Sequence, residues 1–194
     1  IIDGDQVMAT IVTNWHEIGQ LKGDALVATI MSNLGLEKYM ESIGLRLERT
    51  GVGDRYVVAA MQKMGCNIGG EQSGHIVLSD FNTTGDGLVA ALQVLAVLTE
   101  KGRPVSNLFK LFKPYPQLLK NVRYNEDIDP LKSKNVKQAI RDGESSLNGN
   151  GRVVIRKSGT EPLIRVMVEG EDDNIITNVA NDIVASVQAS TQSD

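Results

Sequence analysis

Residues 156–161 combine the side chains that a phosphate group requires. The stretch reads Arg-Lys-Ser-Gly-Thr-Glu, and Arg165 follows on what we expect to be a returning strand. A guanidinium offers a planar fork of N–H groups, hydroxyls add donors, and glycine lets backbone N–H groups approach closely. Arg156, Ser158, Gly159 and Thr160 together fit a phosphate dianion. The alternative is an ordinary polar hairpin turn. The glycines before the lysine and the following helix that a P-loop needs are both absent from the pattern.

A second polar stretch, Gly69 to His75, has side chains suited to a sugar. The Glu71 carboxylate can accept bonds from sugar hydroxyls or an amine, and Ser73 can donate or accept. His75 titrates near neutral pH and could move a proton. The alternative is a solvated turn in which His75 is an ordinary histidine at the edge of a strand.

Two further stretches could bind an anion or a metal. Arg55 follows Asp54 at the start of an expected helix, where a cation is unfavourable for the helix dipole, so Arg55 is either an anion ligand or a surface arginine. The carboxylates of Asp3 and Asp5 could share a Mg²⁺ ion. A helical pattern continues directly from these residues, and no third ligand is evident nearby. Helix capping is therefore the better interpretation, and we expect no metal site.

Composition narrows the class of protein. The chain has 194 residues, 41% of them hydrophobic, and a net charge of −4, which argues against a nucleic-acid partner. The single cysteine, Cys66, has no base near it in sequence, so we expect a buried structural thiol in a reducing, cytoplasmic compartment. No long apolar run or signal peptide is present, so we expect no membrane association. We assign no role to His16, and Asp127 and Asp129 form an acidic loop.

Hydrophobic periodicity predicts an α/β domain over residues 1–112, in which strands alternate with helices. Expected strands start near residues 25, 45, 66 and 75. Expected helices cover about 5–18, 34–43, 55–64 and 88–98, the last apolar all round and therefore expected to be buried. Prolines mark a linker at 113–116. Residues 117–194 follow the order β-α-β-β-α, a small α+β domain with two helices on one side of a sheet.

These stretches, taken in order, resemble the α-D-phosphohexomutase superfamily. The residues that carry the resemblance are Asp3 to Gln6, Thr50 to Tyr56, Gly69 to His75, Thr83 to Gly87 and Arg156 to Arg165. The likeness runs over essentially the whole chain. The Glu-Gln-Ser-Gly-His and Gly-Asp-Arg-Tyr forms are similar to the glucosamine branch, because phosphomannomutase-type members tend to have Met where Gln72 stands.

The resemblance implies a parent of four domains, of which this chain is similar to the third and fourth. In fold terms, that is a three-layer α/β domain with a mixed sheet, followed by a TBP-like α+β domain. It also implies interconversion of glucosamine 6-phosphate and glucosamine 1-phosphate, with glucosamine 1,6-bisphosphate as intermediate and activator. The phosphorylated serine of the first domain and the Mg²⁺ loop of the second lie outside this sequence, as its start at Ile1 rather than Met also suggests. We therefore expect the fragment alone to be inactive.

By the same resemblance, Glu71 and Ser73 would bind sugar hydroxyls, and His75 would lie at the reacting site with Arg55. Arg156, Ser158, Gly159, Thr160 and Arg165 would bind the phosphate that is not transferred. The partners implied are a phosphosugar and the missing amino-terminal domains, and a homodimer of the full-length protein is compatible with the resemblance. Two rival hypotheses stay open: a mutase for mannose or glucose phosphates, and a non-catalytic sugar-phosphate binding module.

Overall fold

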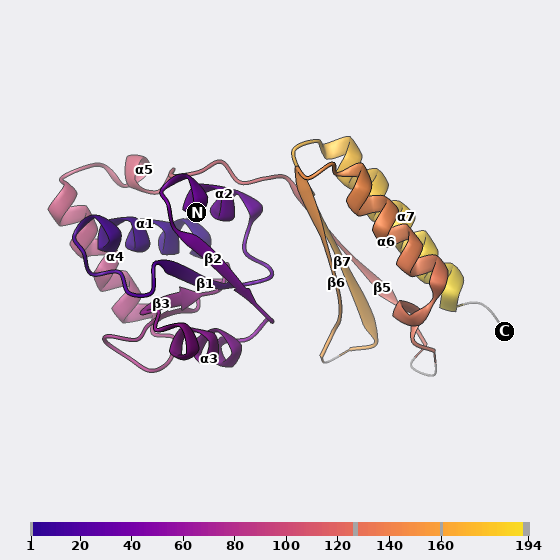
Figure 1. Cartoon of the computed structure of the whole chain (residues 1–194), viewed down its shortest axis with the longest axis horizontal. Helices are drawn as coiled ribbons and strands as arrows, with labels where there is room; N and C mark the ends of the chain where they lie inside the picture. The colour runs from indigo at the N-terminus through magenta and orange to yellow at the C-terminus, as the bar shows by residue number, and fades with distance from the viewer. Residues whose placement is uncertain (1, 126–127, 160, 192–194) are drawn as a thin grey trace. The chain divides into compact units, whose positions relative to one another are not determined.

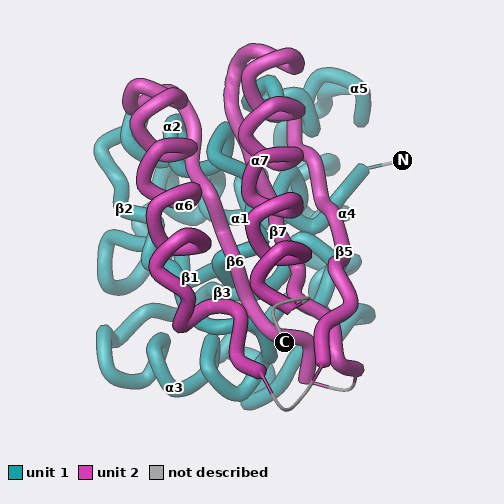
Figure 2. Tube along the Cα trace, turned by 90° about the vertical axis from the view of Figure 1, so that its right-hand side faces the viewer, with its two compact units in different colours: residues 1–114 teal, residues 115–194 magenta. Residues whose placement is uncertain are grey.

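A computed structural model describes residues 2–125, 128–159 and 161–191 of the chain. The chain forms two compact units, Ile1–Pro114 and Tyr115–Asp194, which are coloured separately in Figure 2. Each unit has its own buried core.

The first unit is built on a mixed four-stranded sheet. Its strands are β1 (Ala25–Thr29), β2 (Arg46–Thr50), β3 (Ile68–Gly70) and β4 (Ile76–Leu78), arranged in the order β2-β1-β3-β4. Strands β2, β1 and β3 run parallel, and β4 pairs antiparallel with β3. Every residue of β1 is buried, as expected for a central strand with helices on both faces.

Helices cover both faces of this sheet, which confirms the predicted three-layer α/β fold (Figure 1). Helices α1 (Gly4–Glu17), α2 (Leu34–Ser42) and α4 (Gly87–Lys101) pack on one face around a cluster that includes Met8, Leu26 and Leu36. Helix α3 (Asp54–Met64) packs on the other face around Val27, Val57 and Met61. A short helix, α5 (Val105–Leu108), which the sequence did not predict, precedes the boundary between the units.

The prediction that the apolar helix near residues 88–98 is buried is wrong. In α4 only Ala90 and Val97 are buried, whereas Leu88, Leu92 and Leu95 are 80%, 62% and 55% exposed. Composition indicated how apolar the helix is, but not how many neighbours surround it. Within the described residues, helix α1 and strand β4 cover one side of α4 and leave the opposite side open.

The glycines of the second polar stretch also lie elsewhere than predicted. Gly69 and Gly70 belong to β3, where they are fully enclosed, and the loop begins only at Glu71. A Cβ atom on Gly69 would lie 2.7 Å from both Met61 Sδ and Val57 Cγ1. Gly69 therefore allows α3 to pack closely on the sheet, and Gly70, whose Cβ atom would lie 2.5 Å from the His75 carbonyl oxygen, allows close approach of the neighbouring strand.

The second unit has the predicted β-α-β-β-α order. Strands β5 (Gln117–Arg123), β6 (Gly151–Lys157) and β7 (Leu163–Gly170) form an antiparallel sheet in the order β5-β7-β6. Helices α6 (Lys134–Ser146) and α7 (Asp173–Thr191) lie together on one face, with a short 3-10 turn, η1 (Pro130–Lys132), before α6 (Figure 1). Because Ile164, Val166 and Val168 face these helices, the alternate residues of β7 face the opposite side of the sheet.

Candidate functional site

The loops of the first unit that carry polar residues meet at one edge of its sheet. Strands β1, β2 and β3 are parallel, so the segments that follow Thr29, Thr50 and Gly70 leave the sheet at the same edge. In parallel α/β sheets this edge is where ligands are usually bound. The predicted sugar loop and the turn before Arg55 are therefore neighbours, although 16 or more residues separate them in sequence.

Glu71 joins these two loops by hydrogen bonds. Its Oε1 accepts a bond of 2.9 Å from the backbone N–H of Gly53, and its Oε2 accepts a bond of 3.1 Å from the Ser73 hydroxyl. Ser73 Oγ in turn lies 3.1 Å from Nδ1 of His75. The three predicted residues Glu71, Ser73 and His75 thus form one chain of contacts. The sequence did not predict the bond to Gly53, because the pairing depends on strand order.

This chain of contacts fixes the tautomer of His75. A serine hydroxyl has a single proton, and Ser73 donates it to Glu71. The Ser73 oxygen must then accept from Nδ1–H of the imidazole. In the neutral ring the lone pair is consequently on Nε2, which is free to accept a proton or a hydrogen bond. His75 and Ser73 are both exposed, so this Nε2 is accessible to a ligand.

Arg55 lies in the first turn of α3 and is exposed. Its guanidinium stacks on the ring of Tyr56, 4.5 Å from the ring centroid, and its Nη2 lies 2.5 Å from the Tyr56 hydroxyl. Stacking leaves the edge of the guanidinium open for an anion while limiting its freedom of rotation. The structure brings Arg55 next to the turn that Glu71 holds.

The acidic stretch Asp3–Asp5 does not fit a metal ion. Asp3 is the N-cap of α1 and accepts a bond of 2.9 Å from the Gln6 N–H, which confirms the capping prediction. Asp5 is fully buried and accepts a bond of 2.8 Å from the Asn33 N–H. Burial raises the pKa of Asp5 to about 6, against the opposing effect of the bond from Asn33. Within the described ranges, no group of three or more His, Cys, Asp or Glu residues could hold a metal.

In the second unit, two arginines face each other on neighbouring strands. Arg156 of β6 pairs in register with Arg165 of β7, so both side chains lie on the sheet face that the helices leave open. Residues opposite each other in this way have Cβ atoms about 5 Å apart, and like charges there destabilise the sheet. The Nε atoms of both are buried and have no hydrogen-bond partner among the described residues.

The electrostatics of Arg156 agree with an anion site. Burial, and then the neighbouring Arg165 charge, hold the pKa of Arg156 below its ordinary value. Lys157, the next residue, is engaged elsewhere, because its Nζ lies 3.0 Å from Asp129 and packs over the Tyr124 ring. Among the described residues no acidic side chain forms an ion pair with Arg156 or Arg165, and a phosphate dianion would neutralise both guanidiniums through charge-assisted hydrogen bonds.

The turn after β6 carries the rest of the predicted phosphate loop. The Ser158 N–H donates to the Leu163 carbonyl oxygen at 2.7 Å and closes the hairpin. Gly159 is exposed, and a Cβ atom there would meet nothing within 4 Å, so the space above it is open. Thr160 lies outside the described residues, as does Asp127.

One residue of this group was not predicted from the sequence. Asn121 of β5 is directly opposite Arg165 and shares the open face, so Asn121, Arg165 and Arg156 form a row across the three strands. Asn121 is exposed and its amide can both donate and accept. Strand register alone places it here, because 35 residues separate it from Arg156 in sequence.

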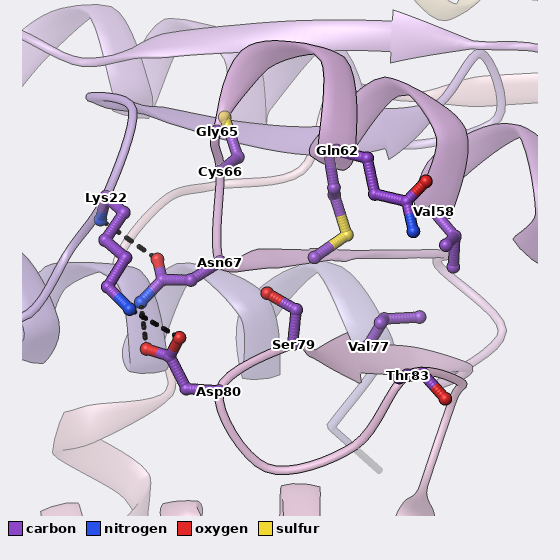
Figure 3. A pocket seen from close by; sticks show the side chains of 11 residues that line it. Lys22, Val58, Gln62, Gly65, Cys66, Asn67, Val77, Ser79, Asp80 and Thr83 are labelled. Atoms are coloured by element: carbon purple, nitrogen blue, oxygen red, sulfur yellow. Dashed lines mark hydrogen bonds and ion pairs between the residues drawn. The ribbon is translucent and has the colours of Figure 1, made fainter.

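The cavity in Figure 3 lies away from this edge, between α3, β4 and the loop that follows β4. It measures about 270 Å³, and three of its polar side chains contact one another. Lys22 Nζ lies 2.6 Å from Asp80, and Asn67 donates to Asp80 at 2.8 Å. Cys66, which lines this cavity, is buried as predicted, and burial raises its pKa. None of the predicted site residues lines the cavity.

Comparison with known proteins identifies the class. The chain belongs to the phosphoglucomutase/phosphomannomutase family: residues 3–115 match its α/β/α domain III and residues 119–186 match its C-terminal domain. No helix within the described ranges is long and apolar enough to cross a membrane. His16, to which we assigned no role, is exposed on α1.

Two relatives that are similar to this chain in sequence are proteins named phosphoglucosamine mutase. The one from Parvibaculum lavamentivorans is 61% identical over 188 residues, which is 97% of this chain and 42% of the relative. The one from Rhodospirillum centenum is 60% identical over 98% of this chain and 41% of the relative. The chain thus spans about two fifths of their length.

A solved structure, Aspergillus fumigatus N-acetylphosphoglucosamine mutase in complex with GlcNAc-6P and magnesium, has a TM-score of 0.79. The two sequences are 20% identical, and the match covers 98% of this chain and 44% of the Aspergillus fumigatus chain. At this level of identity, the likeness supports the fold alone.

Proposed function

We propose that this chain is the substrate-binding carboxy-terminal part of a phosphoglucosamine mutase. The whole protein would interconvert glucosamine 6-phosphate and glucosamine 1-phosphate through a phosphoserine and a bisphosphorylated sugar. The observation that carries the proposal is the Arg156–Arg165 pair, whose like charges face each other with buried, unpartnered Nε atoms. The names of the relatives, at about 60% identity, support the choice of sugar.

In this proposal the second unit binds the phosphate that is not transferred. Arg156 and Arg165 supply the charge, and Asn121 adds a neutral amide at the end of the row. Ser158 and Gly159, in the turn after β6, offer a hydroxyl and backbone N–H groups as further donors, and Thr160, which lies outside the described residues, would add a second hydroxyl. Because a dianion neutralises two guanidiniums at once, binding should stabilise this part of the sheet.

The first unit binds the sugar. Glu71 and Ser73 have oxygens that can exchange their present internal bonds for bonds to sugar hydroxyls or the amine. His75 presents Nε2 as a proton acceptor, and Arg55 offers a positive edge for the reacting phosphoryl group. Residues on separate loops can grip the intermediate in either orientation, so positioning supplies much of the rate.

Mg²⁺ and the nucleophilic serine belong, in this proposal, to the preceding domains of the same polypeptide. The partners of this chain are then a phosphosugar, with glucosamine 1,6-bisphosphate as the intermediate, and its own upstream domains. We expect no nucleic acid partner, a cytoplasmic location, and no mutase activity of the 194-residue chain alone.

Assay of the full-length polypeptide on glucosamine, glucose and mannose phosphates tests the choice of sugar. The proposal expects the glucosamine phosphates to be the best substrates by kcat/KM. Preference for a mannose or glucose phosphate would favour the other mutases of the family. Calorimetry on the 194-residue chain then separates a stand-alone binding module from part of an enzyme: micromolar affinity for glucosamine 6-phosphate without the other domains would contradict the proposal.

A further inference from the structure

Helix α4 presents an apolar stripe to solvent. Leu88, Leu92 and Leu95 are 80%, 62% and 55% exposed, and the neighbouring Ala91 and Ala96 are also exposed. These positions recur at intervals of three and four residues, so they form one continuous face of the helix. A contiguous exposed apolar face marks an interaction surface, whereas isolated exposed leucines are ordinary.

No charge interrupts the stripe over three turns. The charged residues of α4 are Glu100 and Lys101 at its carboxy-terminal end. Both contact α1: Glu100 accepts a bond from Asn14, and Lys101 pairs with Glu17. The exposed face itself therefore has the composition of an interface centre, from which charged residues are usually excluded.

The stripe continues into an apolar groove at the start of the chain. The groove measures about 640 Å³ and runs between α4, the first turn of α1 and the sugar loop. Ala91, Val94 and Leu95 form one wall, and Ile2 and Val7 form another. Ile2, which lines this groove, is itself 41% exposed.

Family membership indicates what covers this surface. The two matched segments are domain III and the C-terminal domain of the family, and the relatives are more than twice as long as this chain. The length that the relatives have in addition must therefore lie largely before Ile2. That preceding length is covalently attached at the groove, where Ile2 lies, and the groove adjoins the stripe through Ala91 and Leu95.

We propose that the α4 stripe and the adjoining groove form the interface with the domain that precedes Ile2 in the same polypeptide. The inference rests on family membership and on exposure, not on the proposed sugar. Gln72, Ser73 and Gly74 line the same groove. A domain docked in the groove would therefore contact the sugar loop at Gln72, Ser73 and Gly74, so its docking would affect the position of this loop.

Cysteine labelling tests this interface. Leu92→Cys, placed in a Cys66→Ala background so that it is the only thiol of the segment, reports whether the stripe is covered. The rate of reaction with a maleimide is measured in the 194-residue chain and in the full-length polypeptide with its other cysteines removed. Ser146→Cys at the exposed end of α6 is the matched control, and Leu88→Cys is a second probe in case Leu92→Cys folds poorly.

We expect the stripe cysteines to react as fast as the control in the 194-residue chain. In the full-length protein they should react at roughly one tenth of that rate or slower, because the maleimide then reaches them only when the interface opens locally. The rate of the control cysteine should be unchanged. Equal rates in both proteins would overturn the proposal. So would slow labelling in the 194-residue chain at all concentrations, since its own second unit would then cover the stripe. Slowing that grows with protein concentration would instead assign the surface to a second copy.

Discussion

Replacing Arg156 with glutamine should weaken phosphate binding without weakening the fold. The structure places this guanidinium opposite Arg165, with a buried Nε that has no partner among the described residues. Like charges directly opposite on strands cost roughly 0.2–1 kcal/mol, so the free energy of unfolding without phosphate should stay the same or rise by up to about 1 kcal/mol. Loss of a charged hydrogen-bond donor should cost the bound phosphosugar about 1.5–3 kcal/mol, which corresponds to roughly 10- to 150-fold in affinity.

Arg152 provides a matched control on the same strand and face. It donates from Nε to the fully buried Glu169 at 2.6 Å. The same substitution there, Arg152→Gln, removes the same charge but leaves Glu169 buried without its cation, at a cost of about 3 kcal/mol of stability. The two variants therefore share their chemistry and should change stability in opposite directions.

Urea unfolding with and without glucosamine 6-phosphate measures both quantities. The wild-type midpoint should rise with ligand, since a ligand that binds only the folded state stabilises it. The Arg156→Gln midpoint should be unchanged or higher without ligand and should respond much less to ligand. The reasoning would be refuted if Arg156→Gln lost as much ligand-free stability as Arg152→Gln, or if it kept the full response to ligand.

Three further outcomes follow from the structure. Asp5→Asn should raise the free energy of unfolding at pH 8 by up to about 3 kcal/mol and give little gain at pH 4. The pKa of Asp5 is raised from 3.8 to about 6, so the folded protein favours the protonated carboxyl, and the stability that protonation gives is lost as pH rises through 6. An equal gain in the free energy of unfolding at both pH values, measured by chemical denaturation, would contradict this. Gly69→Ala should cost about 1–3 kcal/mol by thermal or urea unfolding, because its Cβ would meet α3, whereas Gly87→Ala, with nothing within 4 Å, should be neutral or slightly stabilising. Asn121→Ala should weaken phosphosugar binding about three- to ten-fold by calorimetry with stability unchanged within about 0.5 kcal/mol, and unaltered binding would remove Asn121 from the site.

Local patterns were sufficient for most of the element order. The spacing of apolar residues predicted the helices α1 to α4, α6 and α7, and all seven strands, because helix and strand periods are visible over a few residues. Asp3 was identified as a cap for the same reason, since capping involves only the next three residues. The short elements α5 and η1 were missed because a helical period of about 3.6 residues cannot repeat within four or three residues.

The error on α4 shows where local information ends. Its sequence is apolar on every side, and burial was inferred from that alone. Whether such a helix is covered depends on how many other elements reach it. In this chain only part of its circumference has neighbours, and this exposed face carries the proposed domain interface.

By itself, the sequence determined which side chains are available, and from their types it predicted Glu71, Ser73, His75, Arg55, Arg156 and Arg165 as ligands of a phosphosugar. Only the tertiary structure decided how they combine. Parallel pairing of β1 with β2 and β3 brings Glu71 to the Gly53 N–H, and antiparallel register sets Arg156, Arg165 and Asn121 in one row. The physical reason is that side-chain chemistry is a property of each residue, whereas strand order and register are set by the packing of the whole sheet.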